Sequence, residues 1–211
     1  NKFINELKEL YYSYAFNKID IEYELSNLED NQNFTDIQFN INEGKISKIN
    51  KINFIGNSFF KRSILLDNIK SQQRNYLKLR IFNNFKYYVV ENDNLRLKNL
   101  YLDSGFRDIK VESKIEFLES KNKFNIYFYI DEGKLYSFDN FYINIGLKNI
   151  NLEQIEDIKN NFDILIKEKF RKNKTFNISN INSIEKDISQ LLYDKGFSFF
   201  DIEIEEKLED Q

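Results

Sequence analysis

The stretch "LKNLYLDSGFRDIKVE", Leu97–Glu112, decides how this chain divides, because a similar phrase occurs twice more. It reads "LKELYYSYAFNKIDIE" at Leu7–Glu22 and "ISQLLYDKGFSFFDIEIE" at Ile188–Glu205. Each copy passes from an apolar pattern typical of a helix, through a small residue and a phenylalanine, into the alternating pattern of a strand. The repetition predicts that one structural unit recurs along the chain.

Two independent landmarks share one period. The small residues of the three phrases, Ala15, Gly105 and Gly196, lie 90 and 91 residues apart. A second signature, "INEGK" and "IDEGK", places Gly44 and Gly133 at a spacing of 89 residues. Periods of about 20–50 residues are typical of solenoids. A period of about 90 residues instead predicts a string of small whole domains.

The middle copy, residues 45–133, predicts a β-α-α-β-β unit. The expected elements are one strand, two helices and two strands, at 49–55, 59–70, 87–104, 109–117 and 124–130. Ser58 is expected to cap the first helix. Gly105 is expected to end the second helix with a positive φ, and Phe106 to pack back on its last turn. Ala15 stands at that position in the first copy. Because a positive φ costs alanine about 1 kcal/mol, the helix of the first copy is expected to end in a different way.

The chain direction predicts how the strands of a unit pair. A right-handed crossover makes the first and third strands parallel, and the second strand forms a hairpin outside the third. The expected fold class is therefore α+β, with tandem units that each hold a three-stranded mixed sheet of order 1-3-2 and two helices on one face. Glycines expected to be structural are Gly44, Gly56, Gly105, Gly133 and Gly196.

The flanking segments have the composition of incomplete units. Residues 1–44 supply a helix and two strands, and residues 134–211 supply a unit that lacks its last strand. In the last unit, Asn151 and Gln154 have the spacing of a capping box at the start of a helix. Because half a unit cannot bury its sheet face, the chain is expected to be a piece of a longer array.

Composition excludes several function classes. The 211 residues contain no His and no Cys, so nucleophile–histidine systems, zinc fingers and disulfides are absent. A net charge of -3 argues against nucleic-acid binding. A membrane helix needs a run of about 18 apolar residues, and the sequence has no such run. An enzyme using Asp, Glu and Tyr remains an alternative, but the acids alternate on exposed strand faces, so no cofactor, metal or catalytic site is expected.

The outer strand of the middle unit is the first candidate site. Its alternating charges are expected to protect an open edge from aggregation, and the same edge could accept an extended segment through its backbone groups. Candidate partner-binding residues are Arg107, Asp108, Ile109, Lys110, Val111, Glu112, Ser113, Lys114 and Ile115, with Phe199, Asp201 and Glu203 in the last unit. Tyr127 and Tyr129 face away from the helices, as ordinary cover of the sheet or as part of an apolar groove.

Three motifs in this order resemble POTRA domains. They are the strand and turn "NFIGNSFF" (Asn53–Phe60), the junction "YLDSGFRDIKV" (Tyr101–Val111) and "YIDEGKLY" (Tyr129–Tyr136). The resemblance is greatest to the periplasmic array of outer-membrane β-barrel assembly factors. The chain resembles the end of the second, the whole third and most of the fourth domain there. Gly146, followed by Leu147 and Lys148, departs from the expected Gly-Asn turn.

The resemblance implies a function without catalysis. It implies a periplasmic scaffold of a Gram-negative bacterium that docks unfolded outer-membrane proteins and partner lipoproteins by β-augmentation. It also implies a membrane β-barrel farther along the same protein. POTRA domains occur as well in two-partner secretion and TamA-like transporters, which remain the alternative. No nucleic-acid partner is expected.

Overall fold

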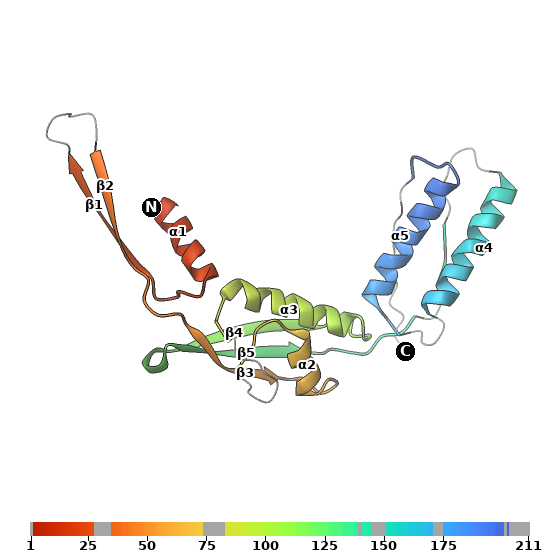
Figure 1. Cartoon of the computed structure of the whole chain (residues 1–211). Coiled ribbons are helices and arrows are strands. Elements are labelled where there is room, and N and C mark those ends of the chain that lie inside the picture. The colour runs from red at the N-terminus through yellow and green to blue at the C-terminus, as the bar shows by residue number, and fades with distance from the viewer. Residues whose placement is uncertain are drawn as a thin grey trace. The chain divides into compact units, whose positions relative to one another are not determined.

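The computed structural model describes residues 2–27, 35–73, 83–138, 141–144, 151–170, 175–200 and 202. The chain divides into two compact units. The first comprises residues 1–98 and 109–132, and the second comprises residues 99–108 and 133–211. Figure 1 labels their helices and strands.

The first unit begins with a helix and a hairpin. Helix α1 (Lys2–Ser13) precedes strands β1 (Asp20–Asn27) and β2 (Thr35–Asn42). The strands pair antiparallel, from Asp20 opposite Asn42 to Asn27 opposite Thr35. The ring of Phe3 on α1 lies 5.4 Å from the ring of Phe39 on β2, so the helix contacts the hairpin.

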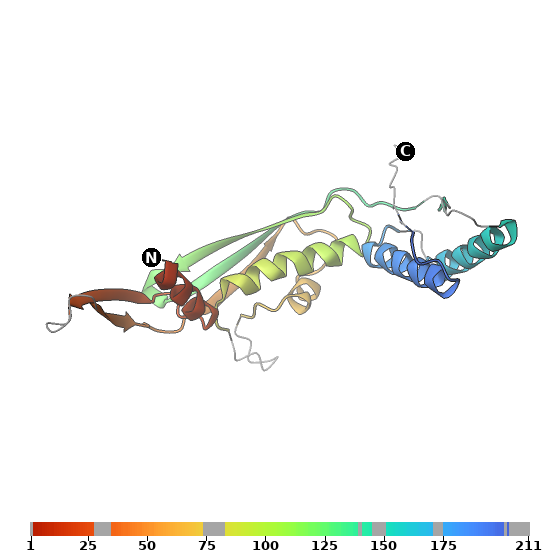
Figure 2. The ribbon, with the colours of Figure 1, turned by 90° about the horizontal axis from the view of Figure 1, so that it is seen from above.

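The middle of the chain forms a separate three-stranded sheet. Its elements are β3 (Lys48–Ile55), α2 (Arg62–Asn68), α3 (Tyr87–Leu102), β4 (Lys110–Leu118), the short 3₁₀ helix Glu119–Lys121 and β5 (Lys123–Asp131). The strand order is β3-β5-β4, with β3 parallel and β4 antiparallel to β5. Figure 2 shows α2 and α3 on the same side of this sheet. The predicted α+β class and the order 1-3-2 are confirmed.

The core of the sheet follows the alternation of β5. Phe124, Ile126, Phe128 and Ile130 are buried, whereas the residues between them are more exposed. On the helix side, Leu65 of α2 and both Val90 and Leu97 of α3 are fully buried. The ring of Phe85 stacks on Phe124 with centroids 3.8 Å apart, which closes the core at the start of α3.

The expected cap at Ser58 is wrong. Helix α2 begins at Arg62, after an N-cap at Lys61 that makes no side-chain hydrogen bond. The backbone N–H of Ser58 donates instead to the carboxylate of Glu132 at 2.8 Å, and the Ser58 hydroxyl donates to the same group. A carboxylate 74 residues away therefore holds the turn, and the helix starts later than expected.

All three copies of the repeated phrase end their helix in the same way. A phenylalanine N–H donates to the carbonyl five residues earlier, which is the Schellman pattern. The three bonds are Phe16 to Tyr11 at 3.1 Å, Phe106 to Tyr101 at 3.0 Å, and Phe197 to Leu192 at 3.0 Å. The Phe106 ring also meets the Tyr101 ring edge-on at 5.5 Å, as expected. Ala15 has a φ of 72°, so the expectation that the first copy ends its helix in a different way is wrong.

A second backbone pattern follows two of these caps, and we call it the cap junction. The carbonyl of the residue with positive φ accepts the backbone N–H of a second residue farther along the chain. The carbonyl of this second residue in turn accepts an N–H from a third segment, which precedes a long helix. The bonds are Ser47 to Ala15 at 2.9 Å and Phe85 to Ser47 at 2.9 Å, then Tyr136 to Gly105 at 2.8 Å and Phe176 to Tyr136 at 3.0 Å. The cap junction thus recurs with the sequence period.

The five glycines expected to be structural share one backbone feature. Gly44, Gly56, Gly105, Gly133 and Gly196 all have a φ between 65° and 104°. This is the left-handed region, which costs glycine little.

The second compact unit is built on two helices. Helix α4 (Leu152–Lys169) starts with the predicted capping box between Asn151 and Gln154, and α5 (Ile178–Asp194) starts after the Asn177 cap. The buried core between them consists of Ile158, Phe162, Phe170, Ile184, Ile188 and Leu192. Phe138 and Phe141 pack against it from the segment after β5. The division into residues 1–44, 45–133 and 134–211 stays a prediction.

Candidate functional site

Strand β4 is an edge of its sheet. Nine consecutive residues, Lys110–Leu118, pair with β5 without a register shift. Within the described ranges, β5 is the only strand that pairs with β4. Every second backbone N–H and C=O group of β4 therefore points to the open side. A straight row of such groups is what an extended segment needs in order to add to a sheet.

The side chains of β4 divide between two faces. Val111, Ser113 and Ile115 are partly buried on the helix side. The Ser113 hydroxyl there accepts a hydrogen bond of 2.9 Å from Asn94 of α3. Lys110, Glu112, Lys114 and Glu116 are exposed on the outer face. The edge therefore presents a charged face and a face supported by α3.

The first residues of the predicted site lie before the strand. Ile109 is buried. Asp108 accepts a hydrogen bond from the Tyr136 hydroxyl and forms an ion pair with Arg107 at 3.5 Å. Arg107 and Asp108 thus belong to the turn after the α3 cap, and Lys110–Ile115 form the part of the predicted site that lies on the edge.

A polar network crosses the outer face of the sheet. The Asn50 side chain donates to Asn125 at 2.9 Å, and Asn125 donates to the Glu116 carboxylate at 3.0 Å. The Tyr127 hydroxyl also donates to Glu116 at 3.0 Å. The hydrogen bonds from Asn125 and Tyr127 hold the pKa of Glu116 below its ordinary value, and the positive charge of Lys114 lowers it further. The bond to Glu116 raises the pKa of Tyr127.

This network separates the two tyrosines of the predicted groove. Tyr127 is engaged with Glu116, whereas Tyr129 is 43% exposed and lies opposite Ile55, which is also 43% exposed. Both register partners are on the outer face. The apolar part of that face is therefore centred on Tyr129 and Ile55. Ile55 was not among the residues predicted for the groove.

The predicted site in the last unit is only partly described. Phe199 is 95% exposed. Asp201 and Glu203 lie outside the described residues. Their role as a second edge remains a prediction.

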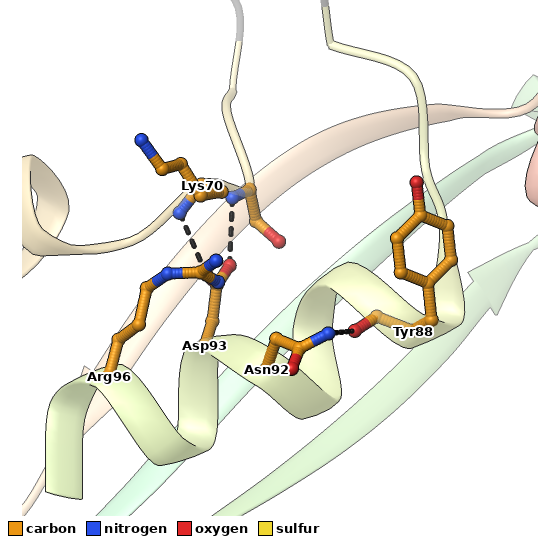
Figure 3. A network of polar contacts seen from close by, with 6 residues as sticks. Lys70, Tyr88, Asn92, Asp93 and Arg96 are labelled. Atoms are coloured by element: carbon orange, nitrogen blue, oxygen red, sulfur yellow. Dashed lines mark hydrogen bonds and ion pairs between the residues drawn. The ribbon is translucent and has the colours of Figure 1, made fainter.

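A buried carboxylate on α3 was not predicted from the sequence. Asp93 is fully buried and accepts the backbone N–H groups of Lys70 and Ser71, both at 2.7 Å. Arg96 donates to it at 2.9 Å. Figure 3 shows these partners converging on Asp93, with Asn92 and Tyr88 paired separately on the neighbouring turn. Both carboxylate oxygens accept hydrogen bonds from the chain itself. The cluster therefore holds the segment after α2 against α3, which is a structural role.

Two candidate features are absent from the described residues. No group of three or more Asp, Glu, His or Cys side chains among them could hold a metal ion. In the same part of the chain, no helix has the length and apolar character needed to cross a membrane.

The middle sheet is similar to a described protein family. Residues 47–133 match the family model POTRA, described as "Surface antigen variable number repeat". The chain is 30% identical over 149 residues to the outer membrane protein assembly factor BamA of Buchnera aphidicola, covering 70% of this chain and 24% of that protein. It is 25% identical over 202 residues to BamA of Neorickettsia risticii, covering 94% of this chain and 26% of that protein.

A solved structure also matches. The crystal structure of Haemophilus influenzae BamA POTRA3-5 aligns with a TM-score of 0.46 and 15% identity, over 93% of this chain and 69% of that one. The chain spans about a quarter of the length of the curated relatives.

Proposed function

We propose that this chain docks extended protein segments in the periplasm. The match of residues 47–133 to the POTRA family model and the similarity of the chain to outer membrane protein assembly factors of the BamA type support the proposal. The proposed partners are unfolded outer-membrane proteins and lipoproteins that work with the assembly factor. The POTRA family is not an enzyme family, and the proposed role is a scaffold role. The relatives' names favour assembly over secretion.

The open edge of β4 is the observation that supports this proposal most directly. Its nine residues pair with β5 in unbroken register, so the opposite side of the strand offers an equally regular row of backbone groups. Docking on backbone groups depends little on the side chains of the guest. A protein that handles many different substrates needs this tolerance.

The outer face supplies a second element of the proposed site. Tyr129 and Ile55 are exposed neighbours on adjacent strands. An extended guest strand on β4 directs every second side chain to this face. We propose that an apolar guest residue opposite Glu112 can reach Tyr129, because Glu112 and Tyr129 are register partners.

The domain organisation is part of the proposal. Residues 1–44 are proposed to end one POTRA unit, residues 45–133 to form a whole unit, and residues 134–211 to form most of a third. The recurring cap junction and the three equivalent helix ends support this division.

The test uses peptides copied from a transmembrane strand of an outer-membrane protein. Addition of the peptide to the full chain should shift the backbone amide signals of every second residue in Lys110–Leu118, because alternate N–H groups face the open edge. Shifts confined to other elements would refute the site.

Alternate N-methylation of the peptide provides a matched control. Methyl groups on one set of alternate peptide nitrogens should abolish binding, and methyl groups on the other set should leave it unchanged, because only one side of the guest strand bonds to β4. Equal binding of the two methylated peptides would rule out strand addition.

A further inference from the structure

The charges on the open strand have a symmetric order. Along the outer face of β4 the exposed residues are Lys110, Glu112, Lys114 and Glu116, which alternate in sign. From Lys110 to Glu116 the charges run plus, minus, plus, minus, and in the reverse direction they run minus, plus, minus, plus. The midpoint of this pattern is Ser113.

An antiparallel strand reads the pattern in reverse. If two β4 strands pair with Ser113 opposite Ser113, Lys110 of each copy faces Glu116 of the other, and Glu112 faces Lys114. Residues directly opposite each other share a face of the sheet. On the helix side, Val111 then faces Ile115. Opposite charges meet on one face and apolar residues meet on the other.

Neighbouring registers lack this match. Centring the pair on Glu112 opposes Lys110 to Lys114 and Glu112 to itself. Centring it on Lys114 opposes Glu112 to Glu116 and Lys114 to itself. Like charges directly opposite each other destabilise an antiparallel pair. Charges on an edge usually prevent self-pairing, but here the register centred on Ser113 opposes each of the four charged residues to a residue of opposite sign.

We propose that β4 pairs with β4 of a second copy of this chain, antiparallel and centred on Ser113. Within the described ranges, no other strand occupies that side of β4, and its register with β5 has no bulge that would turn the edge away. The two-fold axis stands perpendicular to the sheet, and the two three-stranded sheets become one sheet of six strands.

The centre of the proposed pair is polar on the helix side. Asn94 donates to the Ser113 hydroxyl, and the Asn94 side-chain oxygen is buried without a partner among the described residues. Pairing adds a second Ser113 hydroxyl to this side. Two hydroxyls opposite each other can form a cross-strand hydrogen bond.

Self-pairing uses the edge that the proposed function assigns to guest segments. The inference itself requires only the open edge and the order of charges, and it does not depend on guest binding. If both hold, the paired form withholds the edge, and guest and second copy compete for it.

Cysteine cross-linking of the full chain tests the register. The chain has no cysteine, so a single substitution gives an unambiguous thiol. Cα atoms of opposite residues in an antiparallel pair lie about 4.5–5.5 Å apart, within the reach of a disulfide. Ser113→Cys should therefore form a linked dimer under mild oxidation.

Two flanking variants are the matched controls. Glu112→Cys and Lys114→Cys should each stay largely monomeric alone, and a mixture of the two should form the mixed dimer. Cross-linking of either single variant as fast as Ser113→Cys would overturn the register, and no cross-linking of any of them would overturn the pairing.

Charge variants test the cause by sedimentation velocity. Lys110→Glu with Lys114→Glu opposes Glu to Glu at every charged position and should weaken self-association at least about tenfold. Reversing all four charges, with Glu112→Lys and Glu116→Lys added, restores the match and should restore self-association. Circular dichroism verifies the fold of each variant.

The outcomes separate this inference from the proposed function. Equal association of the double and fourfold variants, or a wild-type chain that remains monomeric at all concentrations, would overturn self-pairing. Peptide-induced shifts in Lys110–Leu118 would still support guest docking in that case. Conversely, a linked Ser113→Cys dimer should lose peptide binding and regain it on reduction, and retained binding would show that the edge is not shared.

Discussion

The carboxylate of Asp93 accepts the backbone N–H of Ser71 at 2.7 Å, and both residues are buried. The bond ties the segment after α2 to the middle of α3. The carboxylate also accepts hydrogen bonds from the Lys70 N–H and from Arg96. It therefore anchors the two helices, α2 and α3, that cover the middle sheet.

Asp93→Asn should lower the free energy of unfolding by about 2–3 kcal/mol, because the amide NH₂ would face a buried backbone N–H and leave it unsatisfied. Urea unfolding of the full chain measures this. Asn92→Ala on the neighbouring turn removes only an exposed bond to Tyr88 and is the matched control, with an expected loss below about 1 kcal/mol. Equal losses in the two variants would contradict the anchor role.

Ala15→Gly should stabilise the chain by about 0.5–1 kcal/mol, because a buried alanine at φ 72° carries backbone strain that glycine relieves. The reciprocal change, Gly105→Ala, should destabilise it. An added Cβ there would lie 2.5 Å from a methyl carbon of Thr175 and 2.6 Å from Leu135. Thermal unfolding of the two variants measures the opposite signs, and a shift of the same sign in both would contradict the strain argument.

Gly56→Ala should destabilise the middle sheet more strongly, by about 3 kcal/mol or more. A Cβ at this position would stand 2.1 Å from the backbone carbonyl oxygen of Ile130, so β3 and β5 would have to separate. Hydrogen exchange of β5 amides should become faster throughout the strand. Unchanged exchange would show that the sheet end can relax.

The Glu116 carboxylate should titrate below an ordinary glutamate, because Asn125 and Tyr127 donate to its charged form and lower its pKa. The stability that it contributes is present above the unfolded pKa and is lost as the pH falls through the folded one. For Tyr127, whose pKa is raised, the contribution is lost as the pH rises through the folded value. Both groups are exposed, so these contributions are small.

NMR titration of the carboxyl carbon checks this assignment. Tyr127→Phe removes one donor and should move the Glu116 pKa upward, toward the ordinary value. Tyr129→Phe keeps both donors and should leave the titration unchanged. An upward move in the second variant but not the first would contradict the network.

Sequence periodicity was sufficient for the topology of the middle sheet. The spacing of Gly44 and Gly133 located the unit, and chain direction then determined which strands could be parallel. The phrase around Gly105 also predicted the helix end and the packing of Phe106 on the last turn, where its ring meets Tyr101. These features depend on local sequence and on the short list of allowed connections.

Long-range polar contacts could not be predicted in this way. Nothing near Ser58 indicates that Glu132 would accept its N–H, and nothing near Asp93 indicates that two amides converge on it. Such contacts join residues more than 20 positions apart through turns whose course the sequence does not specify. The same limit applies to the candidate site, where Tyr127 and Tyr129 alternate alike in sequence but differ in their partners.

The cap junctions carry a consequence for how such a chain can change over generations. Their bonds join main-chain atoms only, so nineteen of the twenty amino acids can supply the N–H at Ser47, Phe85, Tyr136 or Phe176. Proline is the exception, and this chain contains none. The side chains at these four positions can therefore change widely in descendants of this gene while the cap junctions themselves are inherited intact.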